Sequence, residues 1–191
     1  QAITLKALPN LLCVLRMLLV YPTALGILEG RYQMVLGLFL LAAFTDGVDG
    51  FLARRFGWSS ELGRILDPLA DKLLMVSTFV CMSVAGLAPW WLTAVVLLRD
   101  LIIVAGAITY RALFGPLHGE PKASSKFNTL CQVLFCLAVV SQAAYGWPVQ
   151  QLVVVLGALV LVTTSVSGLD YVLAYSRRAA TAARARSGAA R

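Results

Sequence analysis

The sequence predicts an all-α, polytopic membrane protein with six transmembrane helices. Two features of its composition point to lipid as the solvent: 60% of the 191 residues are hydrophobic, and only 13% are charged. Soluble domains carry about 25% charged residues. The third feature is a series of apolar runs of about 20 residues, the length that crosses a bilayer core. Because lipid cannot satisfy an open backbone, each run is expected to be a helix.

The predicted spans are 11–28, 33–53, 68–86, 90–111, 127–145 and 149–170. Segments 86–91 and 145–148 combine glycine and proline with tryptophan, which is typical of short turns at the membrane interface. Residues 1–178 are therefore expected to form one six-helix transmembrane domain. The remaining segment, 179–191, is rich in alanine, arginine, glycine and serine, and its composition predicts a basic disordered tail.

The net charge of +7 is unevenly distributed along the chain. Basic residues gather before the first span and after the second, fourth and sixth, whereas the other connections hold only Arg31. The positive-inside rule then places both termini and connections 54–66 and 112–126 in the cytoplasm. We expect a bacterial plasma membrane, with the mitochondrial inner membrane as the alternative. Since most basic residues flank apolar spans, nucleic acid is not an expected partner.

Cysteine and histidine carry no predicted chemistry. Cys13, Cys81, Cys131 and Cys136 all lie in apolar spans without metal-ligand spacing, so they are expected to act as small buried side chains. The single histidine, His118, lies in a polar loop and is expected to be solvated.

Acidic residues are scarce and concentrated. Four of the nine, Asp46, Asp49, Asp67 and Asp71, fall within 26 residues, at the end of the second predicted span and the start of the third. Ionisable groups at membrane depth are costly and usually functional. The spacings i,i+3 and i,i+4 put each pair on one helix face. A short connection makes the two helices antiparallel neighbours, so both pairs are expected to meet near the cytoplasmic interface.

Four clustered carboxylates remain ionised only if cations compensate their repulsion. An all-oxygen ligand set suits Mg²⁺ or Mn²⁺, and four carboxylates with shared ligands suggest two ions about 3.5–4 Å apart. The carboxylates alone also fit a cation or proton pathway in a transporter, or a structural ion-pair network.

The residues around the carboxylates favour a phosphate-bearing ligand. Gly50 and Ala53 flank the acidic face and leave room for a bulky group, and Gly63 is small on the opposing helix. Arg54 is two turns from Asp46 and can reach a phosphate at the interface. Metals, space and a guanidinium are what a diphosphate requires.

These residues follow the pattern D-x2-D-G-x2-A-R-x8-G-x3-D-x3-D. With every fixed position filled, the segment resembles the signature of the CDP-alcohol phosphatidyltransferases. The resemblance implies a CDP-diacylglycerol donor, two divalent cations, and a homodimer with cytoplasmic termini. It implies metal ligation by Asp46, Asp49, Asp67 and Asp71, with Asp71 also the general base. It implies nucleotide and diphosphate binding by Asp49, Gly50, Ala53, Arg54 and Gly63.

Two further segments bear on the acceptor alcohol. Segment 8–16 resembles the opening of phosphatidylglycerophosphate synthases and CMP-forming cardiolipin synthases, although Cys13 replaces a usual threonine. Segment 125–132 resembles the CMP-forming cardiolipin synthases, which favours phosphatidylglycerol over the alternative acceptor, glycerol 3-phosphate. The candidate acceptor-binding residues are Asn10, Arg16, Arg99, Arg111, Lys122, Lys126 and Asn128.

Arg99 and Asp100 are expected about halfway across the fourth span. Adjacent residues on a helix do not face each other, so each should need another partner. Arg16 and Lys72 are the candidate partners of Asp100, and a structural pair is as consistent with the sequence as a substrate contact.

Overall fold

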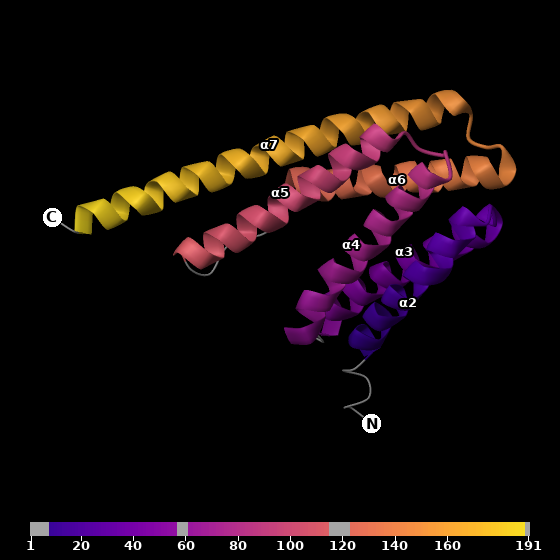
Figure 1. Ribbon diagram of the computed structural model, residues 1–191. Helices are drawn as coiled ribbons and strands as arrows, with labels where there is room; N and C mark the ends of the chain where they lie inside the picture. Colours follow the sequence, from indigo (N-terminus) through magenta and orange to yellow (C-terminus); the bar gives the residue numbers. More distant parts are fainter. Residues whose placement is uncertain (1–7, 57–60, 115–122, 190–191) are drawn as a thin grey trace. The chain divides into compact units, whose positions relative to one another are not determined.

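All elements of the described chain are α-helices, as predicted. A computed structural model describes residues 8–56, 61–114 and 123–189; within these helices the side chains at 8–10, 46, 49–56, 61–68, 110–111, 114, 123, 178–180 and 182–189 are not described. The six helices of these ranges (Figure 1) are α2 (Leu8–Leu28), α3 (Tyr32–Phe56), α4 (Glu61–Val84), α5 (Trp90–Phe114), α6 (Ala123–Tyr145) and α7 (Gln150–Ala189).

Glycines end the helices at two of the tight connections. Gly30 follows α2 with φ +75°, and Gly86 follows α4 with φ +73°. A residue with a Cβ is strained in this left-handed conformation. Both turns are closed by backbone hydrogen bonds, from Arg31 N to Gly26 O and from Leu87 N to Met82 O, each 2.8 Å. The chain therefore reverses within a few residues at both turns, and the turn signals of segment 86–91 predict the second of them.

The helices divide into two compact units. The first comprises Gln1–Trp90 and Cys136–Val153, and the second comprises Trp91–Phe135 and Val154–Arg191. In the first unit α2 packs against both α3 and α4, and Figure 1 shows these three helices side by side. A Cβ at Gly26 would lie 2.6 Å from Val35 Cγ2, so glycine permits the close approach of α2 and α3.

The second unit is built from α5, α7 and the first half of α6. Side-chain hydrogen bonds join all three helices, for example from Arg99 of α5 to Ser125 of α6 and Ser167 of α7. Gly106 of α5 lies against the ring of Tyr175 of α7, where a Cβ would approach ring atoms to 2.6 Å. This unit is therefore held by polar contacts as well as by close packing.

Within the part of the chain that the structure describes, length and composition identify four helices as candidate membrane spans. These are Leu11–Leu28, Trp90–Thr109, Ser124–Tyr145 and Gln150–Arg177. Among the described residues, α3 and α4 contribute shorter stretches, of which Tyr32–Thr45 of α3 is apolar. In these two helices, which carry the aspartate motif, the side chains at 49–56 and 61–68 are not described. At about 1.5 Å per residue, both are still long enough to cross a core of about 30 Å.

The outward face of α4 nevertheless suits lipid. Leu69, Leu73, Val80 and Val84 are exposed and lie along one stripe of the helix. An apolar exposed stripe of this kind indicates contact with an apolar solvent or partner. At the other end of the chain, α7 continues to Ala189, through most of the segment whose composition predicts a disordered tail. Alanine and arginine are strong helix formers, which accounts for the continuous helix.

Candidate functional site

The aspartate motif lies where α3 ends and α4 begins. Asp46 and Asp49 are in the second half of α3, and Asp67 and Asp71 are in the first half of α4. Both helices contact α2, so the two halves of the motif belong to one three-helix cluster. The side chains of Asp46, Asp49 and Asp67 lie outside the described residues, as do those of Gly50, Ala53, Arg54 and Gly63. Asp71 is the member of the motif whose side chain is described.

Asp71 forms an ion pair with a residue 55 positions away. Arg16 Nη1 of α2 donates to Asp71 Oδ1 at 2.6 Å. The Arg16 side chain is completely buried, whereas that of Asp71 is 45% exposed. A buried guanidinium needs a charged partner, because an isolated charge is very costly away from water. The pair therefore orients a carboxylate that remains accessible from outside the helix cluster.

Arg99 and Asp100 correct one prediction. Arg99 Nη1 donates to Asp100 Oδ1 at 2.6 Å, and both residues are buried. The expectation that adjacent helix residues cannot pair is wrong here. Their Cβ atoms diverge, but the long arginine side chain folds back to reach its neighbour's carboxylate. Arg99 and Asp100 therefore neutralise each other's charge within α5.

The same guanidinium links three helices. Arg99 Nη2 donates to Ser125 Oγ at 2.7 Å and to Ser167 Oγ at 2.8 Å. The guanidinium also lies 6.0 Å from the centre of the Tyr171 ring, within range of a cation–π interaction. Arg99 thus has a structural role in the second unit, whichever molecules bind there.

Asn128 of α6 is completely buried, and its carboxamide oxygen contacts α7. Thr163 Oγ1 lies 2.9 Å and Thr164 Oγ1 lies 2.8 Å from Asn128 Oδ1. The sequence motifs do not identify three polar residues of the sixth span, because that span is apolar overall. They are Thr163, Thr164 and Ser167. The run Thr163-Thr164-Ser165-Val166-Ser167 inside that span is the sequence signal that identifies them.

The other predicted acceptor residues have different outcomes. Lys126 is exposed in the first turns of α6. The side chains of Asn10 and Arg111, and the whole of Lys122, lie outside the described residues, as does His118. The four cysteines are free thiols, three of them buried, in keeping with the predicted packing role.

The described side chains contain no cluster of three or more His, Cys, Asp or Glu residues. Three of the four motif aspartates are not among those side chains, so the fit to a metal rests on backbone positions and on Asp71. The donors are carboxylate oxygens, the class that hard divalent cations prefer. The half-exposed carboxylate of Asp71 is reachable by a cation. The described part of the motif, the Asp71 carboxylate, is thus of the donor class that a hard divalent cation takes.

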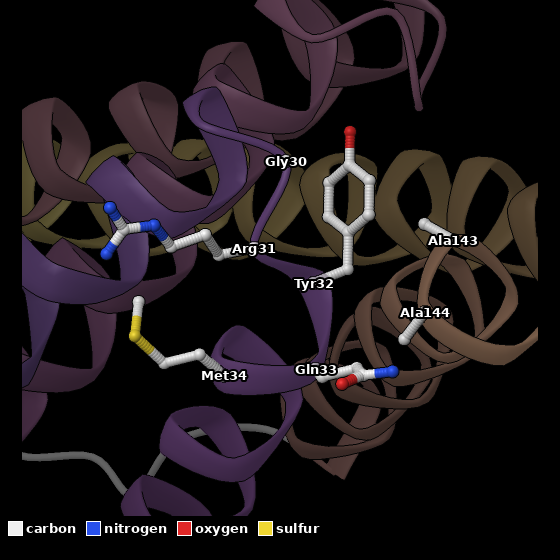
Figure 2. Close-up of a pocket in the computed structure, with 7 residues that line it drawn as sticks. All are labelled: Gly30, Arg31, Tyr32, Gln33, Met34, Ala143 and Ala144. Carbon is white, nitrogen blue, oxygen red and sulfur yellow. The ribbon is translucent and has the colours of Figure 1, made fainter.

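A separate cavity lies at the opposite end of α3. It has a volume of about 360 Å³ and is lined by Gly30, Arg31, Tyr32, Gln33, Met34, Ala143 and Ala144. Figure 2 shows Ala143 and Ala144 of α6 beside Gln33 and Tyr32. By helical rise, Gln33 is about 20 Å along α3 from Asp46. This cavity is therefore not part of the aspartate site.

The sequence profile of the CDP-alcohol phosphatidyltransferase family matches residues 6–166. Because this match covers most of the chain, including every helix that carries the motif, the protein belongs to that family. The six-helix, all-α architecture predicted from the spans agrees with this membership.

Curated relatives divide between two acceptor specificities. The chain is 32% identical over 180 residues to the CMP-forming cardiolipin synthase of Rattus norvegicus, covering 86% of this chain and 60% of the rat protein. It is 30% identical over 173 residues to a probable phosphatidylglycerophosphate synthase of Mycobacterium tuberculosis H37Rv, covering 86% and 79% respectively. It is 34% identical over 170 residues to the CDP-diacylglycerol–glycerol-3-phosphate 3-phosphatidyltransferase of Aquifex aeolicus, covering 86% and 93%. The chain thus spans less than two thirds of the rat enzyme.

Proposed function

We propose that this protein transfers the phosphatidyl group of CDP-diacylglycerol to phosphatidylglycerol, giving cardiolipin and CMP. The acceptor hydroxyl attacks the β-phosphorus of the donor and forms a new phosphate ester bond. The bond between that phosphorus and the bridging oxygen breaks, and the electron pair leaves with CMP. The proton of the acceptor hydroxyl goes to the carboxylate of Asp71.

The observation that carries this proposal is the contact between Arg16 and Asp71. A general base must be accessible to its substrate and must be held in one orientation. Asp71 satisfies the first condition through its 45% exposure, and the 2.6 Å ion pair to buried Arg16 supplies the second. Within this proposal Arg16 is a positioning residue.

Asp46, Asp49, Asp67 and Asp71 would hold two divalent cations, Mg²⁺ or Mn²⁺. When bound, these cations would neutralise the diphosphate and stabilise the charge that develops on the departing CMP. Gly50, Ala53 and Gly63 would leave space for the nucleotide, and Arg54 would bind its diphosphate.

Phosphatidylglycerol is the proposed acceptor because segment 125–132 resembles that of the cardiolipin synthases, among which the rat enzyme is a relative. Glycerol 3-phosphate is the second candidate, favoured by the likeness to the mycobacterial and Aquifex enzymes. A soluble phosphomonoester should require two or three converging cations, for which Arg111, Lys122 and Lys126 are candidates.

The reaction is proposed to take place at the cytoplasmic side of a membrane. The distribution of basic residues supports a bacterial plasma membrane with both termini and the aspartate motif on the cytoplasmic side; the mitochondrial inner membrane is the alternative. A homodimer is the proposed assembly, by resemblance to the family.

The test is CMP release by the purified protein with Mg²⁺ or Mn²⁺, CDP-diacylglycerol and each acceptor in turn. Release with phosphatidylglycerol is expected. Release with glycerol 3-phosphate alone would replace the proposed acceptor with the second candidate. Metal-coupled ion flux in liposomes, with no dependence on CDP-diacylglycerol, would instead indicate a transporter.

A further inference from the structure

The cavity at the start of α3 lies within the first unit and takes no part in the proposed reaction. Its lining comes from residues 30–34, at the turn between α2 and α3, and from Ala143 and Ala144 of α6. All of these residues belong to the first unit. Its volume of about 360 Å³ is at the lower end of the range for small-molecule sites. The cavity can therefore hold the head group of a lipid rather than a whole lipid.

The cavity lies at the ends of two candidate membrane spans. The span Leu11–Leu28 ends just before the lining residues of the α2–α3 turn, and the span Ser124–Tyr145 contains the two lining alanines at its end. Tyr145 and Trp147, which follow these alanines, are exposed. Such aromatic residues are enriched where a bilayer meets water. Because the cavity is about 20 Å along α3 from the aspartate motif, it lies toward the opposite leaflet when α3 crosses the membrane.

Two charges of opposite sign lie at the cavity. Arg31 lines it, and Arg31 Nε lies 3.0 Å from Glu29 Oε2. Both side chains are well exposed. This ion pair uses one nitrogen of the guanidinium and one oxygen of the carboxylate, and the two side chains form no other hydrogen bond among the described residues. The terminal nitrogens of Arg31 and the second oxygen of Glu29 are therefore accessible to a ligand.

The two charges select among lipid head groups. Arg31 is the one charged side chain among the described lining residues, and segment 141–152, which contains the α6 wall, has no charged residue. A purely anionic group would be attracted to Arg31 and repelled by Glu29. A zwitterionic head group places a phosphate against the guanidinium and an ammonium against the carboxylate, so both contacts are favourable. A phosphodiester that carries a primary ammonium therefore matches the pair.

The rest of the lining suits the same ligand. Tyr32 and Gln33 supply a hydroxyl and a carboxamide, which can donate hydrogen bonds to phosphate oxygens (Figure 2). The two alanines of α6 are small and leave the space open. Leu28 and Met34, at the end of α2 and the start of α3, are 51% and 40% exposed. They provide apolar surface beside the cavity for the acyl chains of the lipid.

We propose that this cavity is an accessory site for a zwitterionic phospholipid with a primary ammonium, such as phosphatidylethanolamine. The lipid comes from the leaflet opposite the aspartate motif and is not a substrate. Arg31 binds its phosphodiester, and Glu29 accepts a hydrogen bond from its ammonium. The bound head group connects the α2–α3 turn to the end of α6. This inference is independent of the proposed function, because it requires no turnover.

The test is thermal unfolding of the purified full chain in detergent, with phosphatidylethanolamine or phosphatidylcholine of the same acyl chains added. The two lipids share a phosphodiester and a net charge, but the quaternary ammonium of phosphatidylcholine cannot donate a hydrogen bond. A ligand that binds the folded state raises the unfolding temperature. We expect phosphatidylcholine to need an about tenfold higher mole fraction than phosphatidylethanolamine for the same rise. No stabilisation by phosphatidylethanolamine, or equal stabilisation by both lipids, would overturn the proposal.

Two substitutions separate the two head-group contacts. Arg31→Met removes the partner of the phosphate and should weaken the binding of both lipids by about tenfold. Without added lipid its unfolding temperature should stay close to that of the parent, because an exposed ion pair contributes little. Glu29→Met should abolish the preference for phosphatidylethanolamine over phosphatidylcholine. A variant that keeps the parent's response to both lipids would show that the corresponding contact is not made, and the proposal would fail.

A third substitution tests the cavity itself. Ala144→Phe should fill the space and abolish stabilisation by either lipid. Ala94→Phe is the matched control, because Ala94 is exposed on α5 and is not among the lining residues, and it should keep the full response. If Ala144→Phe responds to both lipids as the parent does, the lipids bind elsewhere and the proposal is wrong. Should Ala144→Phe fail to fold, the variants of Arg31 and Glu29 decide.

Discussion

Two buried arginines, one in each compact unit, are neutralised in different ways. Arg16 of the first unit pairs at 2.6 Å with Asp71, whose side chain is 45% exposed. Arg99 of the second unit pairs at the same distance with Asp100, whose side chain is 10% exposed. A buried arginine that is paired with an accessible carboxylate can contribute to catalysis. A buried arginine that is neutralised by a buried carboxylate stabilises the packing of the helices. The following substitutions test that difference, beginning with the largest expected effect.

Asp71→Asn should reduce turnover by at least about 1,000-fold, because the carboxamide cannot accept the acceptor's proton and is a poor metal ligand. CMP release in the standard assay measures the loss. Nucleotide binding should survive in part, and CDP-dependent thermal stabilisation is the control for folding. Near-normal activity in this variant would remove Asp71 as the base.

Asp100→Asn should act on stability rather than on chemistry. Removing one partner of a buried ion pair leaves an uncompensated charge and typically costs about 3–5 kcal/mol. We therefore expect a large fall in the thermal unfolding temperature in detergent. Asp100→Asn combined with Arg99→Met should recover part of the loss, and a single variant as stable as the parent would contradict the architectural role.

Arg16→Met should lower kcat by about 10- to 100-fold while changing KM for CDP-diacylglycerol less, because a positioning residue acts through the orientation of Asp71. Arg16→Lys should recover part of kcat, since it restores the charge without the planar guanidinium. A fall in stability with kcat unchanged would make Arg16 structural, like Arg99.

Arg31→Met is the matched control with the smallest expected effect. Arg31 pairs with Glu29 at 3.0 Å in the same unit, but both side chains are well exposed, at 65% and 47%. Exposed ion pairs contribute about 0–1 kcal/mol. Activity and unfolding temperature should both remain close to those of the parent, and a loss comparable to that of Arg16→Met would abolish the distinction between buried and exposed arginines.

The sequence was sufficient to predict helices and to locate the motif, because apolar run length and turn residues are local signals. Asp46, Asp49, Asp67 and Asp71 were identified on the ends of two helices, and the structure has α3 and α4 there.

Partners across helices could not be predicted in the same way. The pairing of Arg16 with Asp71 depends on how α2 packs on α4, which no local pattern encodes. The Arg99–Asp100 pair was missed because the spacing rule describes Cβ directions and not the reach of a long side chain. Contacts across helices also identify three polar residues of α7 as structurally important. Asn128 contacts Thr163 and Thr164, and Arg99 contacts Ser167.

The central claim is that the aspartate motif, with Asp71 oriented by Arg16, joins a phosphatidyl group to a lipid hydroxyl. Mass spectrometry of products formed from isotope-labelled phosphatidylglycerol and CDP-diacylglycerol tests it most directly. One labelled glycerol per cardiolipin, with one CMP released for each, is the predicted result. CMP release without labelled cardiolipin, or the absence of both products with folded, metal-loaded protein, would contradict the account.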